Sequence, residues 1–191
     1  MIIGSHNTMS YMKPKHWWMK PFLFMAKCQD KTIEEQYEYG ARLFDLRLVF
    51  DKNGNVGFAH GLFSFQGNLD EVLSYLNSKM ERVYVRILNE RDKNYDLFKK
   101  KCMQIKLKYS HIMFIGGINK KDWKQLYDFE SNTNLKIIDK YSSMNNDTSI
   151  GTGWHLDDLF PRIYAFCFNK HWKEKYLTQP VYLMQDFIGV Y

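Results

Sequence analysis

Five short apolar runs in this chain each end in polar residues capable of acid–base or phosphate chemistry. Between apolar runs of this kind lie longer segments of helical periodicity, a pattern typical of βα units and a parallel sheet. Catalytic residues of parallel α/β barrels lie where the strands end. The pattern therefore predicts a site at the mouth of a barrel, and its five runs are 2–7, 40–47, 56–61, 135–141 and 181–186.

The expected fold is α/β: a compact, distorted (β/α) barrel of the TIM type, mostly parallel, in one domain spanning 1–191. A chain of 191 residues with 45% hydrophobic content is long enough for one sizeable core. Asn-Gly within 51–55 predicts a tight antiparallel hairpin as the one departure from βα order. We expect strands near 2–6, 42–50, 55–60, 82–89, 111–116, 135–141, 162–168 and 181–188, helices over 32–39, 69–78, 95–109 and 120–129, and a surface loop over 142–153.

Charge and hydropathy bear on partners and compartment. The net charge of +6 suits an anionic partner, but the basic residues are spread along the chain, so nucleic acid is not expected. The first residues already form a strand-like run, so we expect no signal peptide, and no run reaches the ~20 apolar residues of a bilayer span. We expect a soluble monomer, cytoplasmic or released by a non-classical route, with peripheral and transient membrane contact. Cys28, Cys102 and Cys167 lack metal-ligand spacing and are expected to be buried, reduced thiols.

Two histidines and an arginine stand at the ends of the predicted strands. Residues two apart on a strand share a face, so Asp45 lies with Arg47. Together with His6 and His60 they supply a general base, a general acid, a fixed cation for a phosphoryl oxygen and a carboxylate. This set favours phosphodiester cleavage over acyl transfer, because no Gly-x-Ser-x-Gly elbow surrounds Ser5.

An ordered set of motifs resembles the X-domain of phosphatidylinositol-specific phospholipase C, in particular its metal-independent bacterial branch. The resemblance covers nearly the whole chain, with shortened loops. The motifs are Ser5-His6-Asn7-Thr8, the helix through Gln36 followed by Gly40-Ala41-Arg42-Leu43-Phe44-Asp45-Leu46-Arg47, then His60-Gly61, Asp139-Lys140-Tyr141 and Gln185-Asp186-Phe187.

The resemblance implies a mechanism for cleaving phosphatidylinositol-type lipids. His6 would be the general base on the inositol 2-hydroxyl, oriented by Asp186. Arg47 would stabilise charge on the phosphoryl oxygens, and His60 would protonate the diacylglycerol leaving group. Asp45 would position Arg47 or assist the acid. The products would be diacylglycerol and a cyclic inositol phosphate, which water can then open slowly.

The substrate pocket implied by the resemblance contains two departures from the family pattern. Asp139 and Tyr141 would contact the inositol ring. Asn7 stands where the bacterial branch usually has an aspartate that hydrogen-bonds the acid histidine, and a neutral amide raises the histidine pKa less. Leu88 stands where a pocket lysine is usual, and Arg86, on the same face, could supply the missing charge.

The segment 15–24 mixes aromatic and cationic residues as interfacial segments do. It occupies the place where the bacterial enzymes dock on the bilayer, so Trp17 and Trp18 are candidate membrane contacts. Burial of this segment in the core is an equal alternative.

Two alternatives to the lyase stay open. One is a metal-dependent glycerophosphodiester phosphodiesterase on a similar barrel, and the other is a catalytically silent lipid- or phosphate-binding domain. Calcium usually takes about 6–8 oxygen ligands, and Arg47 occupies the position where the calcium-using branch has an acidic ligand. We therefore expect no cofactor, no catalytic metal and no metal bound beside His6.

Overall fold

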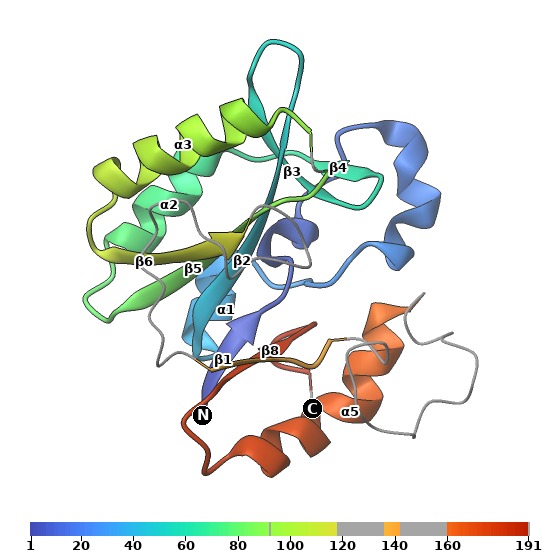
Figure 1. Ribbon diagram of the computed structural model, residues 1–191. Coiled ribbons are helices and arrows are strands. Elements are labelled where there is room, and N and C mark those ends of the chain that lie inside the picture. Colours follow the sequence, from blue (N-terminus) through green and yellow to red (C-terminus); the bar gives the residue numbers. More distant parts are fainter. Residues whose placement is uncertain (92, 118–135, 142–159, 191) are drawn as a thin grey trace.

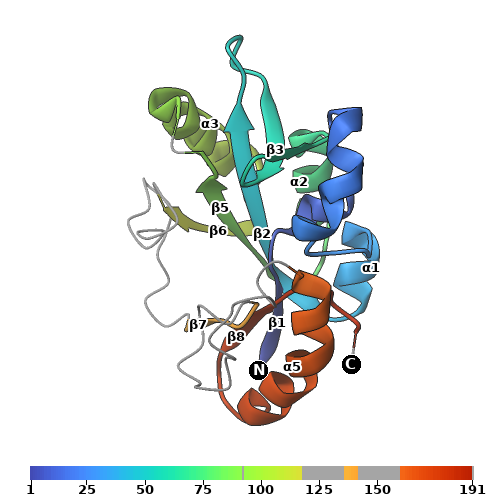
Figure 2. The same cartoon turned by 90° about the vertical axis from the view of Figure 1, so that its right-hand side faces the viewer.

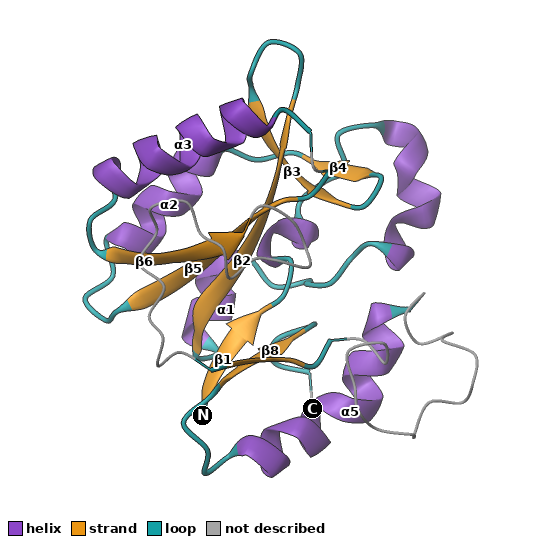
Figure 3. Ribbon diagram, in the orientation of Figure 1, coloured by secondary structure: helices purple, strands orange, loops and turns teal. Residues whose placement is uncertain are grey.

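In the computed structural model, which describes residues 1–91, 93–117, 136–141 and 160–190, the strands form one curled sheet with the helices around it (Figures 1 and 3). The sheet order is β4-β3-β2-β1-β8-β7, with β5 beside β2 and β6 beside β5. This curled half-barrel confirms the predicted α/β class and its distorted barrel form. The described strands are β1 (Ile2–Ser5), β2 (Ala41–Phe50), β3 (Val56–His60), β4 (Phe63–Phe65), β5 (Val83–Asn89), β6 (Ile112–Gly117), β7 (Ile137–Asp139) and β8 (Tyr182–Gln185).

β2 lies in the middle of the sheet, between β1, β3 and β5 (Figure 2). It pairs in parallel with β1 near its start and with β5 over 43–48. Side chains on both of its faces are buried, including Leu43, Phe44, Leu46 and Leu48. A strand buried on both faces reads as an almost continuous apolar run, which is the pattern that made it predictable.

The end of β2 turns back into β3 through the predicted hairpin. Leu48 pairs with Phe58 in antiparallel register, and the Asp51 carboxylate accepts hydrogen bonds from the backbone N–H groups of Asn53 and Asn55. Gly54 adopts the positive φ of 81° that the turn needs. The hairpin brings His60, the last residue of β3, back toward the sheet.

Helices α1 (Ile33–Glu38), α2 (Leu69–Asn77) and α3 (Tyr95–Lys108) occur where sequence periodicity predicts them. The capping box of Thr32 and Glu35 begins α1, and Asn68 caps α2 by accepting from the Asp70 backbone N–H. Apolar residues of α2 and α3, such as Leu73 and Phe98, belong to the same core as β2 and β5.

The predicted strand over 162–168 is wrong, since these residues lie in α5 (Pro161–Tyr176), which packs beside β8 (Figure 1). Aromatic and β-branched residues there suggested a strand. The buried residues Pro161, Tyr164, Ala165, Asn169 and Trp172 instead follow helical spacing, and Pro161 suits the first turn of a helix.

Two cysteines are buried as expected, namely Cys28 and Cys102, whereas Cys167 is exposed on α5. Its exposure follows from the helical conformation that the sequence analysis missed.

Two short 3-10 helices, η1 (Thr8–Tyr11) and η2 (Trp17–Met25), follow β1. The expected helix 120–129 and loop 142–153 lie outside the described residues. Within the described ranges, no helix combines the length and the apolar character needed to cross a bilayer.

Candidate active site

β1 and β8 bring the first candidate pair together. Their parallel register places Ser5 beside Gln185, so that His6 and Asp186 follow at the same edge of the sheet. Nδ1 of His6 lies 2.5 Å from Oδ1 of Asp186, and both residues are buried. The carboxylate therefore fixes the proton on Nδ1 and leaves Nε2 of His6 as the nitrogen that faces the rest of the site.

Arg47 and Asp45 share one face of β2, as strand alternation predicts. Nη2 of Arg47 lies 2.6 Å from Nε2 of His6, and Nε of Arg47 donates to Oδ2 of Asp45 at 3.0 Å. The other oxygen of Asp45 accepts from Nε of Arg86 at 2.9 Å, because the β2–β5 register sets these two residues side by side. Asp45 thus holds two buried guanidinium groups in place.

Glu90 is a site residue that the sequence analysis missed. Its Oε2 accepts from Nη1 of Arg47 at 3.3 Å, and its Oε1 accepts from the backbone N–H of Gly61 at 2.6 Å. Glu90 thereby links Arg47 to the turn that follows His60. Its position directly after β5 is the signal that could have revealed it, because His6 and Asp186 likewise directly follow β1 and β8.

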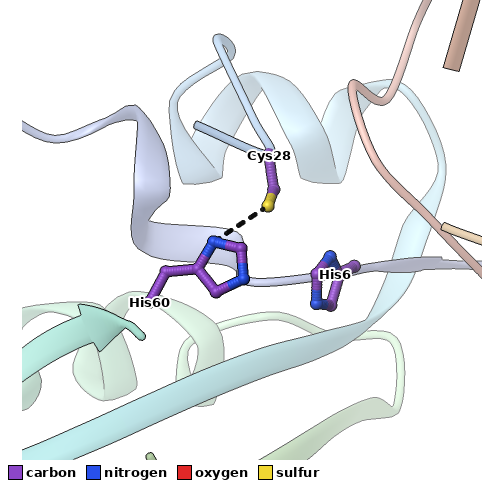
Figure 4. Close-up of side chains that lie close together, drawn as sticks. All are labelled: His6, Cys28 and His60. Carbon is purple, nitrogen blue, oxygen red and sulfur yellow. Dashed lines mark hydrogen bonds between the residues drawn. The ribbon is translucent and has the colours of Figure 1, made fainter. Parts of the chain in front are cut away.

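His60 faces His6 across the site. The two ring centroids lie 5.7 Å apart with the rings nearly perpendicular. Nδ1 of His60 lies 2.9 Å from the carbonyl oxygen of Ala26 and 3.5 Å from Sγ of Cys28 (Figure 4). The backbone carbonyl of Ala26 is therefore an orienting partner of this imidazole.

Asn7 contributes its backbone to the site. With a left-handed φ of 41°, its N–H donates to Oδ2 of Asp45 at 3.1 Å. Its side-chain nitrogen Nδ2 is buried and has no hydrogen-bond partner in the described part of the chain. The orienting contact to Nδ1 of His60 that the sequence analysis considered for Asn7 is made here by Ala26.

Asp139 and Tyr141 reach the site from β7 and the residues after it. Oδ1 of Asp139 accepts from Nη1 of Arg86 at 2.9 Å. The ring of Tyr141 stacks on His6 at a centroid distance of 3.5 Å. This stacking helps to leave His6 only 2% exposed, so a ligand that reaches Nε2 must displace the Tyr141 ring or enter beside His60.

Burial and neighbouring charges set the protonation of the site. Burial, followed by the charge of Arg47, lowers the pKa of His6 well below its ordinary value. Burial raises the pKa of Asp186 well above the ordinary value of a carboxyl group. Burial alone would also raise the pKa of Asp45, but the charges of Arg86 and Arg47 reverse this and hold it far below its usual range. His6 is thus a neutral imidazole at neutral pH.

A buried glutamine that the sequence analysis missed supports the strand ends. Nε2 of Gln29 donates to the backbone carbonyls of His6 and Gln185, at 3.0 and 3.1 Å. It therefore joins the two chain segments that carry His6 and Asp186. Gln29 lies in a loop without periodicity, so the sequence offered no signal for it.

Trp17 and Trp18 lie on η2 with 80% and 54% of their surfaces exposed. Phe22 and Phe24 of the same helix are also more than half or about half exposed, at 54% and 50%. The described structure therefore places this segment on the surface rather than in the core.

The described residues offer two kinds of metal-binding group in the site. The carboxylates of Asp45, Glu90 and Asp139 are each engaged by an arginine. His6, Cys28 and His60 each present one ligand atom, and these three atoms all lie within 4.8 Å of one another. A site for a hard cation such as calcium is therefore poorly supported, while nitrogen and sulfur donors are grouped.

Comparisons with solved structures identify the fold. The chain is similar to the phosphatidylinositol-specific phospholipase C from Listeria monocytogenes, with a TM-score of 0.67 and 16% identity, over 97% of this chain and 87% of that one. It is also similar to a single-residue variant of the enzyme from Staphylococcus aureus, with a TM-score of 0.66 and 15% identity, over 98% of this chain and 85% of that one. A further S. aureus structure, concerned with modulation of that enzyme's membrane binding, gives a TM-score of 0.62 at 17% identity, over 98% of this chain and 86% of that one. No family model matches the chain, and no curated protein matches it by sequence.

Proposed function

We propose that this chain, which has the fold of the bacterial phosphatidylinositol-specific phospholipases C, cleaves phosphatidylinositol-type lipids to diacylglycerol and a cyclic inositol phosphate. One observation carries the proposal. The ring centroids of His6 and His60 lie 5.7 Å apart, and His6 also contacts the Asp186 carboxylate and the buried Arg47. This is the constellation that metal-free phosphodiester cleavage needs.

His6 is the general base in this proposal. Its lowered pKa keeps the imidazole neutral, so that Nε2 can take the proton of the inositol 2-hydroxyl. The 2-hydroxyl oxygen then attacks phosphorus. Asp186, at 2.5 Å from Nδ1, stabilises the imidazolium that forms and holds its tautomer.

His60 is the general acid. It donates a proton to the oxygen of the diacylglycerol leaving group as the bond to phosphorus breaks. The imidazole reaches this position because the hairpin returns β3 to the sheet and the Ala26 carbonyl orients Nδ1. After release of the cyclic product, proton exchange with water restores both histidines.

Arg47 stabilises the phosphoryl charge. The guanidinium already carries hydrogen bonds to Asp45 and Glu90, so its orientation is fixed before substrate arrives. Substrate replaces the contact between Arg47 and Nε2 of His6. A preorganised, always protonated group contributes most in a water-excluded site.

The remaining pocket contacts are those of Asn7, Arg86, Asp139 and Tyr141. Arg86 lies within reach of a ring hydroxyl or phosphate near Asp139, since its Nη1 donates to that carboxylate. The exposed aromatics of η2, led by Trp17 and Trp18, provide the transient contact with the membrane surface.

Turnover of a chromogenic inositol phosphodiester tests the enzyme. Phosphorus NMR of the products from phosphatidylinositol, and from choline, ethanolamine and glycerol headgroups, then identifies the substrate class and whether the phosphate is cyclic. Cyclic phosphate from the inositol lipid alone is the expected result. An open glycerophosphate product that requires added metal would establish the glycerophosphodiesterase instead.

One observation favours a silent binding domain as the second candidate. The Tyr141 ring stacks on His6 and Arg47 contacts its Nε2, so the ring face and the reactive nitrogen of the base are both engaged in this structure. Tyr141→Ala separates the two functions. If the protein is an enzyme whose tyrosine moves aside for substrate, the Tyr141→Ala variant should show higher or at least measurable turnover. If the parent protein and the variant both bind inositol phosphate and neither turns it over, the protein is a binding domain.

A further inference from the structure

Cys28 stands beside the two histidines and has no role in the proposed reaction. It is buried in the loop after η2, with Sγ 3.5 Å from Nδ1 of His60. Figure 4 shows the Cys28 and His60 side chains directed toward each other, with the His6 ring beside them. One ligand atom from each of the three residues lies within 4.8 Å of the other two. Imidazole nitrogen and thiolate sulfur are the ligands that zinc prefers in proteins.

Both imidazoles have the support that metal-binding histidines usually have. Such a histidine donates one ring N–H to a carboxylate or a backbone carbonyl, and its second nitrogen holds the metal. Nδ1 of His6 contacts the Asp186 carboxylate, and Nδ1 of His60 contacts the Ala26 carbonyl. In each ring, Nδ1 therefore already has a partner of the kind that orients a metal-binding histidine.

The charge of the surroundings does not oppose a divalent cation. Arg47 contacts Nε2 of His6, but its guanidinium is also bound by two carboxylates and keeps both bonds when that contact is lost. Carboxyl groups outnumber guanidinium groups in the site. The carboxyl groups belong to Asp45, Glu90, Asp139 and Asp186, and the guanidinium groups belong to Arg47 and Arg86.

We propose that His6, Cys28 and His60 form a zinc site, and that zinc bound there inhibits the enzyme. Zinc with bonds of about 2.0–2.3 Å to nitrogen and sulfur needs its ligand atoms to close in by about 1 Å from their present separation. Binding converts the thiol to a thiolate and releases one proton to solvent. The fourth ligand is water or a phosphate oxygen.

The inhibition, but not the binding, rests on the proposed function. Zinc binds the nitrogen lone pair with which His6 acts as a base. It also binds the lone pair that holds the proton of His60 when His60 acts as an acid. It also covers the position of the substrate phosphate. The expectation of no metal beside His6 rests on the oxygen ligands of calcium, whereas Cys28 comes close to His60 only in the folded chain. A catalytic role for metal remains unexpected.

Zinc titration of the chelator-treated protein, with a chromophoric zinc indicator as competitor, tests the binding. We expect one zinc per chain. Cys28→Ala should weaken the zinc affinity at least about 10-fold. Loss of a residue that only hydrogen-bonds a metal ligand already lowers metal affinity by about 10–100-fold, and Cys28 is a ligand itself. Cys167→Ala removes an exposed thiol and is the matched control, with unchanged affinity. Equal affinity in Cys28→Ala and the parent protein overturns the site.

Cobalt substitution identifies the ligand. A thiolate-to-cobalt charge-transfer band should be present in the parent protein and in Cys167→Ala, and absent in Cys28→Ala. Urea unfolding checks that Cys28→Ala is folded. If it is not, Cys28→Ser, which keeps the side-chain volume closer, takes its place. Absence of the band in the parent protein overturns sulfur ligation.

Activity assays test the inhibition separately. Zinc should inhibit hydrolysis of the inositol phosphodiester and excess chelator should restore it. Cys28→Ala should keep its activity without zinc and need at least about 10-fold more zinc for half inhibition. Equal sensitivity in both proteins overturns the inhibitory role. If no turnover is found at all, the proposed function fails while the titration and the cobalt band still decide whether the zinc site exists.

Discussion

His6 and Asp186 are 180 positions apart in the sequence, yet Nδ1 of one lies 2.5 Å from a carboxylate oxygen of the other. The pair follows adjacent parallel strands, β1 and β8, whose register fixes both residues at one edge of the sheet. Burial disfavours the charged form of each partner taken alone. When a proton arrives on Nε2, the positive charge of His6 is therefore stabilised chiefly by the nearby Asp186 carboxylate.

Asp186→Asn should lower kcat by about 10²-fold or more and change KM little, because the carboxylate acts when His6 becomes charged. In the parent protein, activity should fall as the pH drops through the His6 pKa, which lies below the usual value of about 6.5. Removing the carboxylate lowers this pKa further, so the acidic limb of the kcat/KM profile should move to lower pH. A change confined to KM would show that Asp186 contacts the headgroup instead.

His6→Ala and His60→Ala should each reduce turnover by about 10²–10⁴-fold with folding intact. The parent pH–rate profile should be bell-shaped, since one histidine acts neutral and the other protonated. His111→Ala, at an exposed position before β6, is the control and should leave turnover unchanged. Near-normal turnover in either site variant would refute the assignment of base or acid.

Arg47→Lys should lower kcat/KM by at least about 10²-fold, because a point charge cannot keep the contacts to Asp45 and Glu90 and also bind two phosphoryl oxygens. Full activity should persist in excess chelator, since a guanidinium replaces a catalytic cation. Activity that chelator abolishes and calcium restores would reverse this conclusion and support the metal-dependent alternative.

Trp17→Ala combined with Trp18→Ala should weaken binding to phosphatidylinositol vesicles, measured by sedimentation, while hydrolysis of a soluble inositol phosphodiester stays normal. These rings are largely exposed and do not pack in the core, so we expect them to contribute to a membrane contact. Leu107→Ala removes an exposed apolar side chain from α3 and is the control. Equal losses on vesicles and on the soluble substrate would indicate a structural role.

Asp45→Asn should lower the free energy of unfolding by about 3–5 kcal/mol, because it leaves the buried guanidinium groups of Arg47 and Arg86 without their shared carboxylate. The folded-state pKa of Asp45 is depressed, so its contribution is present above the unfolded value of about 3.9 and is lost as the pH falls toward the folded value. Glu81→Gln, which breaks the exposed pair with Arg42, should cost far less. Urea unfolding at neutral and acidic pH measures both effects.

Much of this fold is predictable because local patterns agree with it. The buried run of β2, the Asn-Gly hairpin and the capping box of Thr32 each have a short-range signal. Site residues that follow strands, such as His6 and Asp186, could be grouped for the same reason. Each lies beside an apolar run, and the ends of parallel strands meet.

What could not be predicted depends on contacts between distant segments. In α5, aromatic residues favoured a strand locally, while packing against β8 decides for the helix. Cys28 and Gln29 lie in a loop without periodicity, and their approach to His60 and His6 exists only in the folded chain. Glu90 stood after a predicted strand, but its role as a link depends on the turn at Gly61.

The pairing of β1 with β8 also orders events during synthesis. Residues 2–5 are translated well before their partners at 182–185, which follow 180 positions later in the sequence. Contacts of such large sequence separation form slowly. A nascent chain can therefore form the β2–β5–β6 part of the sheet early. The contact between His6 and Asp186 can form only after residue 186 has been synthesised. We expect ribosome-bound chains halted before residue 186 to remain inactive and open to proteolysis at their N-terminal strand.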